Sequence, residues 1–313
     1  MLEYSLRRIA ATVPVLLLVG ILVFSLLYLA PGDPAAVLAG DQASTDEIAR
    51  IRASLGLDQS FLLRFAQWGG GVIRGDLGVS VFSGRSVAAL IAQRLEPTIA
   101  LTFMSLMFAV LIAVPLGIFA AWRAGSWVDR TAMGFAVLGF SVPVFVLSYC
   151  LILLFAVELP IFPVQGYKPI VSGIGPFLSH IILPSFALGI LNAALIARTT
   201  RAAMLEVLRQ DYIRTAQAKG LSVLRVLFGH ALKNAAIPII TIIGISFTML
   251  ISGVVVTETV FNIPGVGRLT VDAILRRDYP VIQGVILLFS LVYVFLNLAI
   301  DLSYALFDPR IRL

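Results

Sequence analysis

The sequence predicts an all-α membrane protein with six transmembrane helices. Of its 313 residues, 59% are hydrophobic and only 13% are charged, and the mean hydropathy of +1.00 lies outside the range of soluble domains. A helix of about 20 apolar residues crosses the hydrocarbon core of a bilayer. Six apolar segments reach or approach this length: Ile9–Ala30, Thr98–Trp122, Thr131–Val157, Ile181–Ala197, Ala235–Thr257 and Val281–Ile300.

The first segment is too long for a cleaved signal peptide, and no small-residue cleavage site precedes residues 31–34. Pro115 and Pro143 lie inside the second and third segments and predict kinks. Gly117 and Gly139 in the same segments favour close helix approach. The fourth segment is the shortest and contains a proline, so we expect it to be tilted, extended by polar turns, or shielded by neighbouring helices.

The distribution of Lys and Arg predicts that both termini are cytoplasmic, because cytoplasmic loops retain basic residues. With the N-terminus inside, the inner segments hold thirteen of the 23 Lys and Arg residues and the short outer loops hold four. The remaining six lie in the first outer loop, 31–97, which is long enough to escape the rule. This retention accounts for the net charge of +6, and no pattern of basic and aromatic residues indicates a nucleic-acid partner.

The first outer loop, 31–97, is predicted to be a small helical insertion. Ser44–Glu47 forms a capping box that begins a helix, and Gly56 ends it. A second helix is predicted from Ser60 to Trp68, with Gly69–Gly71 ending it. These helices either pack on their own membrane domain or form a docking surface for an external partner.

A polar cytoplasmic segment, 198–234, interrupts the apolar chain. Asp211 is predicted to cap a short helix through Ala218, Lys219 and Gly220 break it, and Ser222 caps a second helix that ends near Asn234. A solvated loop that only fixes topology is one interpretation. Small residues before the glycine and apolar residues after it instead favour insertion into a groove of another protein. These residues are Ala216, Ala218, Leu221, Val223 and Leu224.

The chain contains no Gly-x-x-x-x-Gly-Lys-Ser/Thr motif for binding ATP. Acidic residues that an ion-coupled secondary transporter would need in its spans are few, namely Glu158 and Glu258 at span ends and Asp301 in the last span. An intramembrane hydrolase would have to pair His180 with a serine such as Ser148 or Ser185, and no motif fixes that geometry.

The stretch "FNIPGVGRL", residues 261–269, follows Glu258 at the end of the fifth segment. Its proline and glycines are typical of a tight outer turn, and a gate or a contact for an external binding protein is the alternative. The residues concerned are Glu258, Asn262, Pro264, Gly265 and Gly267.

The stretch "DYIRTAQAKGL" at 211–221 resembles the permease subunits of ATP-binding-cassette importers, in the branch that takes up dipeptides, oligopeptides, nickel chelates and glutathione. The family signature is Glu-Ala-Ala, three residues and a glycine. Here Arg214, Thr215 and Ala216 occupy the Glu-Ala-Ala positions, and Gly220 is the glycine, whereas Lys233 replaces the closing proline of the general signature. Similar motifs span the chain: "LRR" at 6–8, "APGDP" at 30–34, "LGLDQ" at 55–59, "GDLGVS" at 75–80, "FNIPGVGRL" at 261–269, "RDYPVIQG" at 277–284 and "DPRIR" at 308–312.

The resemblance implies a type I ABC importer permease fold, with 1–30 as the tail and first helix, 31–97 as the extracytoplasmic insertion and 98–313 as the core transmembrane domain. It implies a non-catalytic subunit of the cell inner membrane, with no cofactor of its own. Its partners would be a homologous but distinct second permease, two ATPase subunits that bind ATP and Mg, and an external solute-binding protein. The implied ATPase-coupling residues are Asp211, Tyr212, Arg214, Thr215, Ala216, Ala218, Lys219, Gly220 and Leu221.

The family resemblance does not distinguish the transported substrate, because the motifs are shared by peptide, glutathione and nickel importers. Short peptides are expected first, since the form Arg-Thr-Ala-x-Ala-Lys-Gly at 214–220 fits the peptide group.

Overall fold

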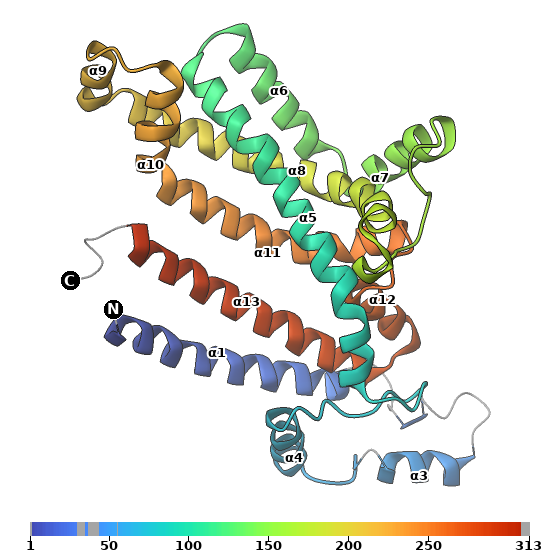
Figure 1. Ribbon diagram of the computed structural model, residues 1–313. Coiled ribbons are helices and arrows are strands. Elements are labelled where there is room, and N and C mark those ends of the chain that lie inside the picture. The colour runs from blue at the N-terminus through green and yellow to red at the C-terminus, as the bar shows by residue number, and fades with distance from the viewer. Residues whose placement is uncertain (1, 30–34, 37–43, 55, 308–313) are drawn as a thin grey trace. The chain divides into compact units, whose positions relative to one another are not determined.

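The computed structural model describes residues 2–29, 35–36, 44–54 and 56–307, and these are almost entirely helical (Figure 1). The predicted motifs at 30–34 and 308–312 and Leu55 lie outside the described residues. The α-helices are α1 Leu2–Leu29, α3 Thr45–Ser54, α4 Phe61–Ile73, α5 Val87–Trp122, α6 Trp127–Ser141, α7 Val144–Ile152, α8 Ile174–Leu208, α9 Asp211–Ala218, α10 Leu232–Asn234, α11 Ala236–Val260, α12 Val266–Arg276 and α13 Tyr279–Phe307. Two π-helical segments, Leu153–Glu158 and Arg225–Ala231, and a 3₁₀ turn, Ile170–Ser172, complete the described helices.

The chain divides into two compact units, which we call the central unit and the terminal unit. The central unit comprises Glu96–Arg268 and the chain from Leu296 onward. The terminal unit comprises Leu2–Leu95 and Leu269–Phe295. Helices α5, α12 and α13 each contribute residues to both units.

Among the described residues, four helices are long and apolar enough to cross a membrane: Val87–Trp122, Ile174–Leu208, Ala236–Val260 and Tyr279–Ile300. Helix α1 contributes a shorter apolar stretch, Ala10–Leu26. The predicted single helix Thr131–Val157 is instead two helices, α6 and α7, bent by 99° at a short break, and they add a fifth span if the pair crosses the membrane.

Pro143 causes this break, in agreement with the kink predicted at this residue. Val142 before it is extended, with φ −91° and ψ 123°, and Pro143 occupies the N-cap position of α7. Proline disfavours the helical conformation of the preceding residue and donates no backbone hydrogen bond. By contrast, α5 continues as helix through Pro115.

Helix α8 is the centre of the central unit, although its sequence made it the weakest predicted span. It extends well beyond Ile181–Ala197 at both ends, and 67% of its most apolar window is buried, against 22–33% for the other three span helices. Its neighbours α6, α7 and α11 pack along it. The expected extension and shielding of this span are therefore confirmed.

Small residues bring α5 and α8 close together. A Cβ atom at Gly117 would lie 2.6 Å from the Ala197 carbonyl oxygen, and one at Gly189 would lie 2.6 Å from the Ser105 carbonyl oxygen. No side chain fits at either position, because real Cβ contacts are longer than this. The expected close approach at Gly117 is confirmed, and the two helices bury an alanine-rich seam between them.

The capping box in the terminal unit forms as predicted. The Ser44 backbone N–H donates to Glu47 Oε2 at 2.9 Å, and the Glu47 N–H donates to Ser44 Oγ at 3.3 Å. The Ser44 backbone N–H, as the larger cause, and the Ser44 hydroxyl, which donates to Oε2 at 3.1 Å, lower the pKa of the Glu47 carboxyl. Gly56, at φ +64°, follows the helix as expected.

The prediction that Gly69–Gly71 ends α4 is wrong, since the helix continues to Ile73. Gly71 instead lets the chain fold back at the end of the helix, where the Arg74 and Asp76 N–H groups both donate to its carbonyl oxygen. Gly75, at φ +82°, is the residue that turns the chain away.

Helix α4 packs on α1 through an aromatic cluster of Phe24, Tyr28, Phe61, Phe65 and Trp68. The Phe24 ring lies 5.2 Å from Phe61, 5.6 Å from Phe65 and 5.3 Å from Trp68, measured between centroids. Aromatic pairs at these separations attract each other beyond the area they bury. The aromatic residues of α4 thus position it against the first apolar helix.

Candidate functional site

The predicted cytoplasmic element forms a short helix, α9, followed by a glycine turn and a second helical stretch. Helix α9 ends at Ala218 as predicted, but its N-cap is Gln210, so Asp211 is the first helical residue and not the cap. Its carboxylate there complements the helix dipole and lies 3.5 Å from Arg214. The second stretch runs to Asn234 as predicted, with π-helical geometry over Arg225–Ala231.

Gly220 adopts φ +79°, and the Leu221 N–H donates back to the Ala216 carbonyl oxygen at 3.3 Å. This left-handed conformation favours glycine. A Cβ atom added there would meet nothing within 4 Å. Backbone conformation therefore explains the glycine within this chain.

One face of α9 is buried in the chain's own core. Ile213 is 1% exposed and Ala216 is 8% exposed. They pack in a cluster that includes Ile118 of α5, Met204 of α8 and Leu227 of the π-helical stretch. Ala216 therefore does not contribute to a free small-residue surface, which differs from the sequence interpretation.

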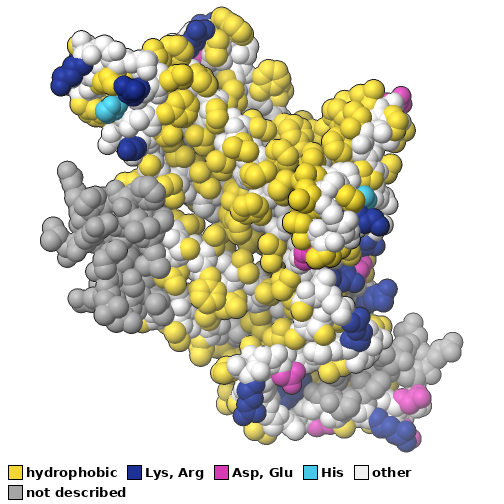
Figure 2. Space-filling model, viewed as in Figure 1, with side chains coloured by type: hydrophobic (Ala, Val, Ile, Leu, Met, Phe, Trp, Pro, Cys, Tyr) yellow, Lys and Arg dark blue, Asp and Glu magenta, His cyan; other side chains and the backbone are white. Residues whose placement is uncertain are grey.

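The opposite face of α9 and the following turn are exposed. This surface, which we call the α9 outer surface, comprises Tyr212, Arg214, Thr215, Ala218, Lys219, Gly220, Val223 and Leu224. The predicted apolar patch is present at Val223 and Leu224, which are 44% and 61% exposed, whereas Leu221 is half-buried against the core. Figure 2 shows Lys and Arg side chains near α9, next to a largely hydrophobic face of α5 and α6.

An ion pair fixes the turn between α5 and α6 to α8. Arg201 binds Asp129 in a bidentate manner, with Nε 2.5 Å from Oδ1 and Nη2 2.6 Å from Oδ2. The Gly125 N–H also donates to Oδ2 at 2.9 Å, and Ser126 caps the helix that carries Asp129. Sequence analysis missed this pair. Its only local signal is the spacing of Ser126 and Asp129, which marks a helix start but not a partner 72 residues away.

Glu258 is fully buried and organises the "FNIPGVGRL" turn. Its carboxylate accepts hydrogen bonds from Thr98 Oγ1 at 2.6 Å and from the Arg268 N–H at 2.8 Å. Thr98 Oγ1 in turn accepts the Val266 N–H at 2.8 Å. The structure thus gives Glu258 the role of holding the following loop. We call Thr98, Glu258, Gly265, Val266, Gly267 and Arg268 the Glu258 cluster.

Gly265 and Gly267 make room for this carboxylate. A Cβ atom at Gly265 would overlap the carboxylate, and one at Gly267 would lie 2.7 Å from Val255 Cα and 3.0 Å from Glu258 Oε2. Of the residues considered for a gate or a binding-protein contact, Glu258, Gly265 and Gly267 are buried, and Asn262 and Pro264 are exposed. Arg268 Nη1 donates to Asn262 Oδ1 across the turn.

Two other motifs, "GDLGVS" and "RDYPVIQG", meet in the terminal unit. Ser80 Oγ donates to the buried carboxylate of Asp278 at 2.5 Å, and Gly78 packs on Pro280. Gln283 Nε2 donates to the Val23 carbonyl oxygen of α1 at 3.3 Å. These segments therefore join the first and last helices of the chain.

Of the residues considered for a hydrolase, His180 and Ser148 bond within their own helices, whereas the buried Ser185 hydroxyl has no hydrogen-bond partner among the described residues. His180 Nδ1 lies 2.8 Å from the Pro176 carbonyl oxygen, and Ser148 Oγ donates to the Val144 carbonyl oxygen within its own helix. Glu158 is exposed at a helix end, and the Asp301 side chain lies outside the described residues. Within the described part of the chain, no three His, Cys, Asp or Glu residues gather where they could hold a metal ion.

Two protein-family models together match most of the chain. Residues 113–313 match the family described as "Binding-protein-dependent transport system inner membrane component", and residues 1–102 match its N-terminal companion family. A probable peptide ABC transporter permease protein, y4tP of Sinorhizobium fredii, is 53% identical over 99% of both chains. The glutathione transport system permease protein GsiC of Escherichia coli O6:H1 is 45% identical over 100% of this chain and 99% of its own.

A solved chain of the MetNI methionine ABC transporter shares the fold, with a TM-score of 0.58 and 19% identity, over 70% of this chain and 96% of that one. The described residues include four helices that are long and apolar enough to cross a membrane, and the short helix α9 follows one of them, α8. The chain belongs to the binding-protein-dependent transport inner membrane component family, the permease subunits of ATP-binding-cassette importers. It is thus a non-catalytic, multi-pass subunit of the inner membrane, and ATP binding belongs to its partner ATPase.

Proposed function

We propose that this permease forms half of an import path for short peptides. Two relatives that cover its whole length support this class: a probable peptide permease at 53% identity and a glutathione permease at 45%. Glutathione is itself a small peptide, so both names indicate substrates with amide bonds and carboxylates. Glutathione uptake is the second candidate, on the strength of that relative.

The proposed assembly contains a second, homologous but distinct permease, two ATPase subunits and an external solute-binding protein. Both chain termini lie in the cytoplasm in this proposal, which places α9 on the side of the ATPases. The retention of basic residues in the segments assigned to that side supports this orientation. The proposed core has six spans, with 31–97 outside the membrane.

The α9 outer surface is proposed to dock in the ATPase subunit. The observation that carries this proposal is that α9 is buried on one face and exposed on the other. Ile213 and Ala216 anchor it to α5 and α8, while Tyr212, Ala218 and Lys219 remain exposed. A helix held in this way transmits a push on its exposed face to the packed spans, because close-packed cores shift between discrete arrangements instead of deforming continuously.

Three alanine-to-tryptophan substitutions test the docking proposal. Ala218→Trp adds bulk to the α9 outer surface, Ala202→Trp adds the same bulk to an exposed position of α8, and Ala216→Trp overfills the core beneath α9. We expect Ala218→Trp to retain its folding and its second permease but to lose bound ATPase and transport in liposomes. Ala202→Trp should behave as the wild type, and Ala216→Trp should lower the unfolding temperature.

Lys219→Ala should be milder than Ala218→Trp, since shape and not charge is proposed to govern docking. Full ATPase retention and transport by Ala218→Trp, with loss in Lys219→Ala, would instead indicate a solvated loop whose charge matters.

The substrate class is tested separately by competing uptake of a labelled dipeptide with oligopeptides, glutathione and a nickel chelate. Failure of every peptide to compete would reject the peptide proposal.

A further inference from the structure

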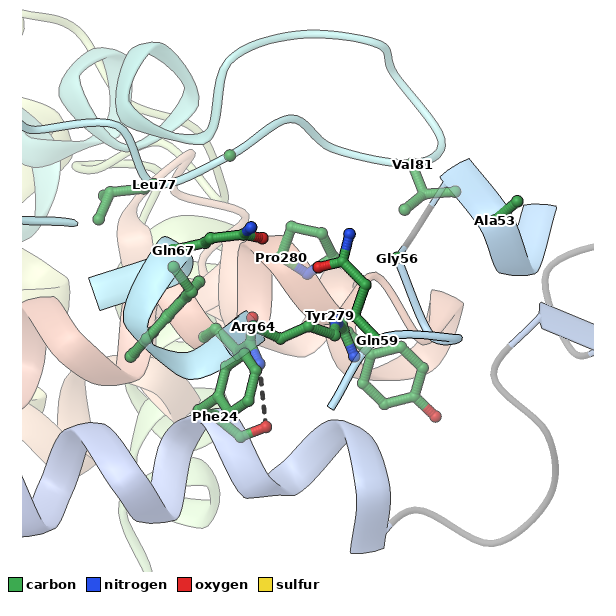
Figure 3. Close-up of a pocket in the computed structure, with 13 residues that line it drawn as sticks. Phe24, Ala53, Gly56, Gln59, Arg64, Gln67, Leu77, Val81, Tyr279 and Pro280 are labelled. Atoms are coloured by element: carbon green, nitrogen blue, oxygen red, sulfur yellow. Dashed lines mark hydrogen bonds between the residues drawn. The ribbon is translucent and has the colours of Figure 1, made fainter. Parts of the chain in front are cut away.

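The terminal unit contains a half-open pocket that shares no residue with the α9 outer surface or the Glu258 cluster. Its volume is about 410 Å³, and Figure 3 shows Arg64 of α4 among the side chains that line it. Phe24, Trp68 and Pro280 supply apolar surface, and Gln59 and Gln67 supply amides. None of the described residues that line the pocket is acidic.

Arg64 is held in place by aromatic rings, and among the described residues its guanidinium makes one hydrogen bond. Its Nη1 donates to Tyr28 Oη at 2.5 Å, and its guanidinium stacks on the Phe24 and Tyr28 rings at 5.6 and 5.4 Å. Among the described residues, no carboxylate forms an ion pair with it. An arginine has five N–H donors in a rigid fork, so its remaining donors form a fork that suits two oxygens of one phosphate.

Gly56 borders the same side of the pocket as the Arg64 Nε atom. A Cβ atom at Gly56 would lie 3.7 Å from Nε and 3.8 Å from the Gln59 side chain. A ligand oxygen at this edge would therefore meet both a guanidinium and an amide.

The surroundings of the pocket indicate a ligand with hydrocarbon chains. Leu22 and Leu26, one turn apart on the α1 helix that supplies Phe24, are 56% and 36% exposed. Leu62 and Leu63, next to Arg64 in sequence, are 76% and 51% exposed. Aromatic residues gathered at the end of an apolar helix are typical of the membrane–water interface, where lipid phosphates lie. A soluble anion would gain nothing from this apolar surface.

We propose that this pocket binds the headgroup phosphate of an anionic phospholipid, with Arg64 as its main ligand. The phosphate accepts hydrogen bonds from the Arg64 fork and from the Gln59 amide beside it, and the Gln67 amide also faces the pocket as part of its lining. The acyl chains follow the exposed apolar residues of α1. The net positive charge of the pocket favours phosphatidylglycerol over zwitterionic phosphatidylcholine. The bound lipid would fill the space between α1, α4 and the start of α13.

Native mass spectrometry of the intact importer complex, in detergent with added phosphatidylglycerol or phosphatidylcholine, tests the proposal. The wild type should retain phosphatidylglycerol preferentially. Arg64→Gln and Gln67→Glu, the second of which adds a repelling carboxylate at an exposed position, should each weaken this binding about tenfold or more. Arg74→Gln is the matched control, because Arg74 is an exposed arginine at the end of the same helix and does not line the pocket.

Three results would overturn the proposal. The first is equal retention of both lipids by the wild type. The second is undiminished phosphatidylglycerol binding in both pocket variants. The third is displacement of the lipid by millimolar inorganic phosphate, which would make the pocket a site for a soluble anion. If Arg64→Gln lowers the yield of folded complex, Gln67→Glu alone decides the matter, since its side chain is exposed.

Discussion

Replacement of Gly267 by alanine tests the packing of the Glu258 cluster. The new methyl group would lie 2.7 Å from Val255 Cα and 3.0 Å from Glu258 Oε2. Backbone cannot yield as a flexible side chain does, so overpacking costs about 1–3 kcal/mol. If the carboxylate moves to make room, it weakens a hydrogen bond to a charged group, which is worth about 1.5–3 kcal/mol. Because this hydrogen bond is weakened and not lost, only part of its energy is added, and the total expected loss is about 2–5 kcal/mol.

The same substitution at Gly134 is the matched control. A Cβ atom there meets nothing within 4 Å, and the residue lies inside helix α6. Alanine should therefore be neutral or stabilising by up to about 1 kcal/mol, because it restricts the unfolded chain. The two variants differ only in what surrounds an identical methyl group.

The assay is thermal unfolding of the purified complex, followed by loss of the monodisperse species at a fixed heating rate. At about 2–4 °C per kcal/mol, Gly267→Ala should lower the midpoint by about 4–20 °C, and Gly134→Ala should not lower it. Gly267→Ala and Thr98→Val should also be less than additive, because both act on the same carboxylate. Equal midpoints for the two alanine variants would refute the described packing around Glu258.

Three further results are expected. Single cysteines placed at Ser44 and at Gln217, in a background without the natural cysteine, should react with an impermeant thiol reagent from opposite sides of the membrane. Labelling of both positions from outside would reject the six-span topology. Asp129→Asn should destabilise the complex by about 1–3 kcal/mol, since it leaves the partly exposed Arg201 without its bidentate partner. The measurement is thermal unfolding, and an unchanged midpoint would contradict the ion pair. Because the pKa of Glu47 lies below its ordinary value of 4.5, its contribution to helix α3 should be present above that pH and lost as the pH falls through the lowered pKa. The protection of the Thr45–Ser54 amides from hydrogen exchange, relative to an unfolded chain at the same pH, should therefore fall more in the wild type than in Glu47→Gln.

Local signals in the sequence predicted local structure well. The Ser44–Glu47 capping box, the end of α9, the glycine turn at Gly220 and the break at Pro143 each depend on a few neighbouring residues, whose backbone preferences act wherever the chain folds. The family motifs at 211–221 likewise identified the class of protein correctly. These features required no knowledge of which segments meet in space.

Features that depend on distant partners were not predictable in the same way. The end of α4 was misplaced because three glycines weaken a helix in isolation, whereas contacts with α1 stabilise this one. Ala216 was assigned to a surface because a small residue has the same appearance in sequence whether it faces a partner or its own core. The ion pair of Asp129 with Arg201 and the burial of Glu258 depend on helix packing that no spacing encodes.

The junction between the first and last helices constrains how the protein is made. Ser80 and Asp278 are 198 residues apart, and Gln283 reaches a carbonyl 260 residues before it. At about 5–20 residues per second, the ribosome needs about 10–40 s to deliver Asp278 after Ser80. During this interval the terminal unit consists of its first part, Leu2–Leu95, in which the aromatic cluster joins α1 and α4. A chain that stops before Asp278 therefore lacks the partners of the Ser80 hydroxyl and of the Val23 carbonyl oxygen, and α1 lacks the helix that packs beside it.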